Sequence, residues 1–136
     1  MRRYVAICLK VPDNTAYTAL VALRRLGIEL GRIERATIVP AGEGGDATAL
    51  ERVRRNERLF NPNLHRVEIR QGVPDRGELL VAETTDVASG GRDDGEVKTS
   101  WRLYDRDGRP VPNATLERAR DALLCNPAIE AAELPA

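Results

Sequence analysis

The chain has 136 residues, 42% of them hydrophobic and 31% charged, which predicts one domain or two very small ones with a buried core. There is no apolar run of about 18 residues and no leader with a cleavage site, so we expect a cytoplasmic protein with no membrane partner. The net charge is zero, which argues against a nucleic-acid partner because that role favours an unbalanced basic surface.

Charge is nonetheless distributed unevenly along the chain. Residues 1–76 contain 14 Lys and Arg against 9 Asp and Glu, a net charge of +5. Residues 77–136 contain 7 against 12, a net charge of −5. A basic half joined to an acidic half can dock within one chain or against a second subunit, and the sequence leaves both arrangements open.

The first half begins with a strand and a helix. Apolar alternation predicts a strand over Tyr4–Val11, and Pro12-Asp13-Asn14 ends it and supplies oxygens that cap a helix. From Thr15 to Gly27 the apolar residues recur at helical spacing, and a glycine is well suited to end such a helix. A second strand is expected over Ile33–Val39.

A second helix and a third strand complete the first half. The helix is expected to begin near Asp46 or Thr48, since Thr48 and Glu51 fit a capping box, and to end at Asn61-Pro62. His65–Arg70 is the expected third strand. Two helices on one face of a small antiparallel sheet predict an α+β fold close to the ferredoxin-like plan.

The second half is predicted to contain three strands and one helix. Gln71–Gly77, rich in turn residues, marks the boundary between the halves. The strands are expected over Glu78–Val87, Val97–Tyr104 and Ala128–Leu134, the helix over Asn113–Cys125, and a polar loop over residues 89–96. Leu116, Ala119, Leu123 and Leu124 form the predicted apolar stripe of the helix.

A short sequence occurs twice, at the end of each half. Leu59-Phe-Asn-Pro-Asn-Leu and Leu124-Cys-Asn-Pro-Ala-Ile share a leucine and an Asn-Pro pair, so Asn61 and Pro62 match Asn126 and Pro127. Each copy is predicted to close a helix and turn into a strand, because proline disfavours helix continuation. The repeat predicts two related units, residues 1–71 and residues 72–136, of which the second is a degenerate copy.

These motifs resemble PurS, the small subunit of phosphoribosylformylglycinamidine synthase. The carrying residues are the Tyr4–Lys10 strand, the helix end Ala22-Leu-Arg-Arg-Leu-Gly27 and the sequence Leu59-Phe-Asn-Pro-Asn-Leu. Leu123-Leu-Cys-Asn-Pro-Ala-Ile-Glu130 is closer still to the family's Leu-Leu-Ala-Asn-Pro-Val-Ile-Glu. The family's chains are shorter, with a Gly-Lys turn and a further strand where this chain has Pro40–Gly45. We therefore expect a duplicated or divergent PurS-like protein.

The resemblance implies a non-catalytic role within a larger complex. PurS-like proteins are compact α+β homo-oligomers that bridge a glutaminase, which releases ammonia, and an ATP-dependent synthase, which uses it. The reaction of the complex is amidation of formylglycinamide ribonucleotide in purine biosynthesis. The resemblance implies no catalytic residue, cofactor or metal in this chain. The alternative, from another class, is a small-molecule-binding regulatory module with a ferredoxin-like fold.

Two loops could bind ions, but we favour a plain loop for the first and turn chemistry for the second. Gly42–Gly45 before a helix could cradle a phosphate, but no Lys or Ser/Thr completes a P-loop, and Glu43 and Asp46 add negative charge. Asp105–Gly108 is similar to the start of a calcium loop, but the remaining ligands are missing.

Single side chains also suggest candidate sites. His65, the only histidine, has no partner at recognisable spacing, so we expect a surface or strand-end residue. Cys8 and Cys125 lie in apolar contexts, which predicts reduced, packed thiols.

Four residues are candidates for an interface. Arg52 and Arg55 belong to an arginine-rich helix face, which is either solvated or in contact with the acidic half of a partner subunit. Trp101 and Tyr104 are candidate interface anchors, with packing in the core as the alternative.

Overall fold

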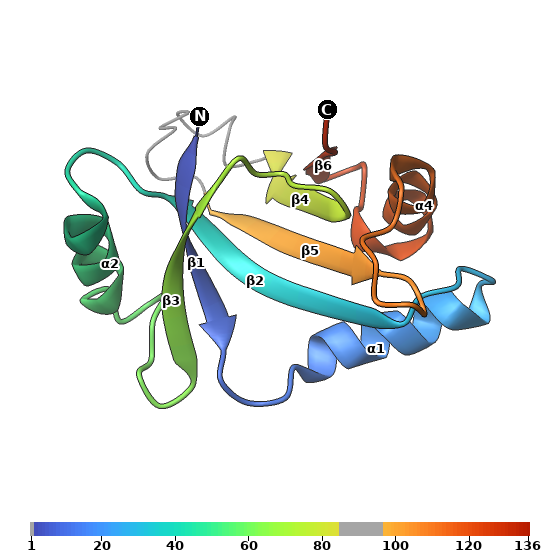
Figure 1. The fold of residues 1–136 in the computed structure, drawn as a ribbon, viewed down its shortest axis with the longest axis horizontal. Coiled ribbons are helices and arrows are strands. Elements are labelled where there is room, and N and C mark those ends of the chain that lie inside the picture. The colour runs from blue at the N-terminus through green and yellow to red at the C-terminus, as the bar shows by residue number, and fades with distance from the viewer. Residues whose placement is uncertain (1, 85–96) are drawn as a thin grey trace.

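The structure, a computed structural model, describes residues 2–84 and 97–136 (Figure 1). The strands are β1 (Arg3–Leu9), β2 (Arg32–Pro40), β3 (His65–Gln71), β4 (Glu78–Glu83), β5 (Lys98–Tyr104) and β6 (Glu130–Glu133). The helices are α1 (Asn14–Arg25), α2 (Asp46–Arg54) and α4 (Asn113–Ala119), which continues into the π-helical turn η2 (Arg120–Leu124). The polar loop expected at residues 89–96 and the end of the strand expected at residues 85–87 lie outside the described residues.

The described strands form one sheet in the order β3-β1-β2-β5-β4-β6. All five pairings are antiparallel, which confirms the α+β class. Each half contributes three neighbouring strands, where the ferredoxin-like plan has four. The β2–β5 pairing joins the halves, so the sheet is single and continuous.

The strand order reads the same from either edge when β1, β2 and β3 are matched to β4, β5 and β6. The registers agree with this match. Leu9 lies opposite His65 in the first half and Glu83 opposite Glu130 in the second, and His65 and Glu130 are aligned in the sequence repeat. By the same match Ile7 of β1 is equivalent to Val81 of β4, and these residues pair with Thr37 and Thr99. Thr37 and Thr99 are therefore equivalent, and they pair with each other at the centre of the sheet.

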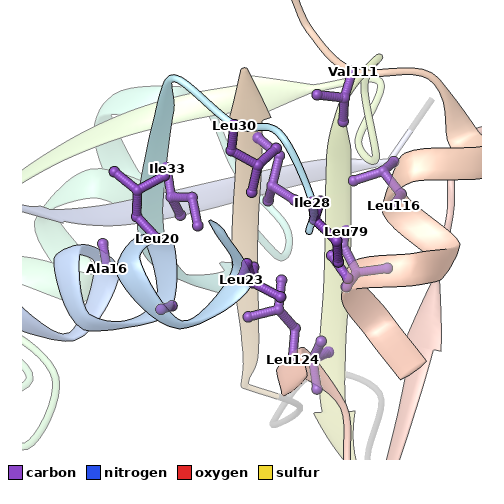
Figure 2. Close-up of a cluster of buried hydrophobic side chains, with 14 residues drawn as sticks. Ala16, Leu20, Leu23, Ile28, Leu30, Ile33, Leu79, Val111, Leu116 and Leu124 are labelled. Atoms are coloured by element: carbon purple, nitrogen blue, oxygen red, sulfur yellow. The ribbon is translucent and has the colours of Figure 1, made fainter. Parts of the chain in front are cut away.

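The largest core cluster lies between the sheet and the helices α1 and α4, as Figure 2 shows. Helix α1 buries the predicted stripe of Ala16, Ala19, Leu20 and Leu23. Figure 2 places Leu23 near Leu79 and Leu124, which belong to the second half. Fully burying such a leucine contributes about 1.5–3 kcal/mol, so one core holds the two halves together.

The ends of α1 follow the predicted signals. The Asp13 side chain accepts a hydrogen bond from the Ala16 N–H at 3.0 Å and also pairs with Arg35 of β2. Gly27 has a φ of 87°, a left-handed conformation that glycine adopts without strain.

Helix α2 covers the same face of the sheet as α1 and α4, at the end formed by the first half. Its Ala49 and Val53 pack against Val5 and Ile7 of β1. Val5 pairs with Val39 of β2, so the two side chains lie on the same face of the sheet. Ile33 of β2, which also has an odd number, packs against α1, so this is the face that α1 covers. Among the described residues, all helices therefore lie on one face, as expected.

The opposite face carries no described helix, yet its central side chains are buried. They are Tyr4, Ala6, Cys8, Ala36, Ile38 and Leu80. A flat sheet would hold β3 and β4 about 19 Å apart, at roughly 4.8 Å per strand. Arg70 of β3 nevertheless approaches Glu78 of β4 to 3.6 Å. The sheet therefore curls toward its helix-free face and encloses these side chains itself.

Helix α2 begins at one of the two predicted positions, but its N-terminal cap and its end differ from the prediction. It begins at Asp46 after Gly45, without a side-chain cap, so the predicted Thr48–Glu51 capping box is wrong. It ends at Arg54, well before Asn61. Asn56 is the physical reason: its side chain accepts from the Arg58 N–H, and its carbonyl accepts from Leu59 and Phe60. Such local bonds compete with continuation of a helix.

The last helix also departs from its predicted stripe. After Ala119 the backbone widens into η2, in which the Cys125 N–H bonds to the Arg120 carbonyl five residues earlier. One residue is thereby added to the turn, so Leu124 faces the core and Leu123 faces solvent. The prediction that Leu123 is buried is wrong for this reason.

Candidate functional site: two equivalent turns and a helix-free face

The first Asn-Pro turn is built by Asn61. Its carbonyl accepts hydrogen bonds from the Leu64 and His65 N–H groups at 2.9 and 2.8 Å. Its side-chain Oδ1 accepts from the Asn63 N–H at 2.9 Å, and its own N–H donates to His65 Nδ1 at 3.0 Å. Short asparagine side chains favour such turns because they bond to nearby backbone.

The second turn repeats these interactions around Asn126. Its carbonyl accepts from the Ile129 and Glu130 N–H groups at 3.1 and 2.7 Å. Its Oδ1 accepts from the Ala128 N–H at 3.1 Å, and its N–H donates to Glu130 Oε1 at 2.8 Å. The predicted turns at Asn61-Pro62 and Asn126-Pro127 are thus confirmed as turns of the same form.

The turns are also anchored to the sheet in the same way. The Lys10 N–H, just after β1, donates to the Leu64 carbonyl at 2.7 Å. The Thr84 N–H, just after β4, donates to the Ile129 carbonyl at 2.8 Å. His65 is therefore an acceptor within a turn, in line with the expected strand-end position.

A buried ionic cluster lies on the helix-free face around Glu78, which is fully buried. Glu78 Oε1 accepts from the Asp75 N–H at 2.8 Å, and Oε2 accepts from the Ser100 hydroxyl. Arg102 and Arg70 approach Oε2 at 3.4 and 3.6 Å. Both carboxylate oxygens are engaged, so the cluster holds β3, β4 and β5 together and leaves no oxygen directed at a ligand.

Sequence reasoning missed this cluster. Glu78 begins a strand that continues Leu-Leu-Val, and a glutamate beside such a run was the available signal. Charged residues are rarely fully buried without a partner. Its burial depends on Arg70 of β3, which three intervening strands separate from β4, and on the curl that brings the two side chains together.

Arg70 also sets the electrostatics around Glu68 and Cys8. Burial acts to raise the pKa of Glu68, but the hydrogen bond and charge of Arg70, with Arg66, outweigh it and hold that pKa below its ordinary value. Burial raises the pKa of the Cys8 thiol, against the opposing charge of Arg70. Burial and the charge of Glu130 raise the pKa of Cys125. Neither thiol has the lowered pKa of an activated nucleophile.

The two arginine candidates have different surroundings. Arg52 Nη1 donates to the Ala41 carbonyl at 2.9 Å and Nη2 to the Glu43 carbonyl at 3.1 Å, so it holds the Gly-rich loop. The Arg55 side chain, directly after α2, is 80% exposed and pairs with Glu51 of that helix at 3.1 Å. Arg55 is the one of the two whose guanidinium is presented to solvent.

The two aromatic candidates lie on opposite faces of β5. Trp101 shares the helical face with Leu103, whereas Tyr104 lies on the helix-free side under the Arg32 guanidinium, 4.2 Å from its ring centre. Trp101 contributes to an apolar groove of about 430 Å³ between α1 and η2. The groove is lined by Asn14, Thr15, Thr18, Ala19, Ala22, Trp101, Leu123 and Leu124.

The two candidate ion loops are occupied by their own contacts. Arg3 donates to the Gly44 carbonyl at 3.2 Å and pairs with Asp46 at the start of α2. Asp105 Oδ1 accepts from the Asp107 and Arg109 N–H groups, both at 2.9 Å. The first loop is held by Arg3, and the second is a turn closed by the Asp105 side chain.

Within residues 2–84 and 97–136, no three His, Cys, Asp or Glu side chains are placed to hold a metal ion together. The helices of that part of the chain are too short or too polar for any of them to cross a membrane. A scan of protein-family models finds no match to the chain, and a search of curated protein sequences finds none.

Proposed function

We propose that this chain is a non-catalytic, PurS-like assembly subunit. It would bridge a glutaminase and an ATP-dependent synthase during amidation of formylglycinamide ribonucleotide, in the cytoplasm. The observation that carries the proposal is the Asn-Pro element, whose second copy resembles the family's sequence and which forms the same turn at Asn61 and at Asn126.

The physical rationale is containment of ammonia. Ammonia that passes between two active sites must be kept from bulk water, which requires a rigid scaffold that holds the two enzymes in register. The curled sheet with its engaged ionic cluster around Glu78 and its shared core supports such rigidity.

We also infer that the units of residues 1–71 and 72–136 derive from one ancestral unit. The matching strand order, the equivalent registers around Thr37 and Thr99, and the matching turns support a common origin. One chain would then occupy the place of two family subunits.

Co-elution tests the assembly role. The protein is mixed with the glutaminase and synthase subunits of its source, with glutamine and nucleotide, and separated by size-exclusion chromatography. We expect one peak that contains all three chains. An Arg55→Glu variant should weaken this peak, whereas Arg25→Glu, an exposed arginine on α1, serves as the matched control. Separate elution of the wild-type chain would refute the proposal.

The groove beside Trp101 favours the second candidate, a small-molecule regulatory module. Its volume of about 430 Å³ falls in the range of ligand pockets, and its lining is largely apolar with a few polar side chains. Trp101 is the only tryptophan, so its fluorescence reports on the groove directly. A screen of nucleotides and amino acids that changes neither this fluorescence nor the melting temperature would exclude these ligand classes.

A further inference from the structure

The two equivalent turns each expose an apolar side chain at the same position. Leu64 of the first turn is 41% exposed and Ile129 of the second is 49% exposed. Beside the first turn, Val11 is 45% exposed and directly follows Lys10, whose N–H bonds to the Leu64 carbonyl. Single exposed apolar residues are common on protein surfaces and do not by themselves mark an interface. The charged residues beside these two side chains distinguish the two turns.

The charges around the two turns are opposite in sign. The first turn carries the exposed residues Lys10, whose Nζ donates to the Pro62 carbonyl at 2.9 Å, and Arg66, which pairs with Glu68 at 3.2 Å. The second carries Glu83 and Glu130, which lie directly opposite each other on β4 and β6. Like charges in facing positions destabilise a sheet. Within the described residues, no ion pair involves Glu83 or Glu130, whereas Glu133, three residues beyond Glu130 on β6, pairs with Arg2 and Lys98.

We propose that the first turn of one copy docks on the second turn of another copy. Leu64 and Val11 would meet Ile129, while Lys10 and Arg66 would face Glu83 and Glu130. The charge complementarity of the two turns selects a second copy of this chain as the occupant. This docking does not depend on which enzymes the protein assembles with.

The positions of the two turns in the fold determine which oligomers this docking can form. The first turn lies where β1 ends and β3 begins, at the lower edge of Figure 1, whereas β4 and β6 lie at the upper right. Each copy can therefore engage a neighbour through both turns. Two reciprocal contacts give a two-fold dimer, and successive contacts give a ring.

Light scattering coupled to size-exclusion chromatography tests this docking. We expect the wild-type protein to associate in a concentration-dependent way at low salt. Association should weaken at high salt, because the screening length falls from about 10 Å at 0.1 M to about 3 Å at 1 M. Lys10→Glu and Glu83→Lys should each weaken association about tenfold or more. A wild-type protein that is monomeric at every concentration would overturn the proposal.

The double variant Lys10→Glu/Glu83→Lys is the decisive test of the proposed contact. It reverses the charge of one group on each turn, so it should restore association that each single variant loses. Failure of the double variant to associate would also refute turn-to-turn docking. Arg25→Glu is the matched surface control. Far-UV circular dichroism verifies that each variant is folded, and Leu64→Ser, which leaves every charge in place, tests the apolar contact independently.

Discussion

Glu78 is the residue whose environment departs most from what its chemistry favours in isolation. It is fully buried, and Ser100, Arg102, Arg70 and the Asp75 N–H surround its carboxylate. Burial of an unpaired charge is strongly unfavourable, so the partners must remain in place for the native sheet to be stable.

Replacement of Glu78 by alanine should destabilise the protein by about 3–5 kcal/mol, because Arg70 and Arg102 would lose their buried counter-charge. Glu78→Gln should cost less, since an amide oxygen still accepts hydrogen bonds. Urea unfolding followed by circular dichroism measures both changes. Glu57→Ala, at an exposed glutamate outside the cluster, is the control. A loss below about 1 kcal/mol for Glu78→Ala would contradict the structural role of the cluster.

At the scale of elements, the Asn-Pro turns are the most informative feature. Each leads the chain into an edge strand with the same set of hydrogen bonds, although the acceptor four residues after the asparagine is His65 in one turn and Glu130 in the other. The turn therefore tolerates a change of acceptor chemistry while it retains its asparagine.

Asn61→Ala and Asn126→Ala should each lower the free energy of unfolding by a similar amount, about 0.5–1.5 kcal/mol. Each substitution removes the side-chain oxygen that accepts from the backbone two residues later. Thermal or urea unfolding gives the two values. Asn63→Ala is the matched control in the first turn, because the Asn63 backbone N–H makes the bond to Asn61. Losses that differ by several-fold between the two sites would argue against equivalent turns.

The two halves share one sheet and one core, so we expect the whole molecule to unfold as one cooperative unit. The β2–β5 pairing runs from Arg32 to Ile38 without interruption. Leu23 of the first half and Leu103 of the second belong to the same core cluster. Neither half can lose this cluster without exposing apolar surface of the other.

Unfolding should therefore be a single transition. Trp101 fluorescence, which reports on the second half, and far-UV circular dichroism should give the same midpoint in urea. Leu23→Ala and Leu103→Ala should each lower the stability by about 2–5 kcal/mol and shift both signals together. Resolved transitions for the two signals would contradict one shared core.

Local signals explain which parts of the fold could be predicted. Asp13 and Gly27 bound α1 as expected, and β5 forms within the strand predicted over Val97–Tyr104. Where several local options compete, prediction was wrong. Asn56 ends α2 early, and the π-helical turn moves Leu123 into solvent.

The amino-acid sequence by itself determined the α+β class, the order of the elements and the repeated Asn-Pro turn. These depend on periodicity and on turn residues within a few positions of each other. Only the tertiary structure decided that the halves share one curled sheet, that Glu78 meets Arg70 inside it, and that the helices cover the Trp101 face of β5 and not the Tyr104 face. Those outcomes depend on strand pairing across long sequence separations, which local pattern does not encode.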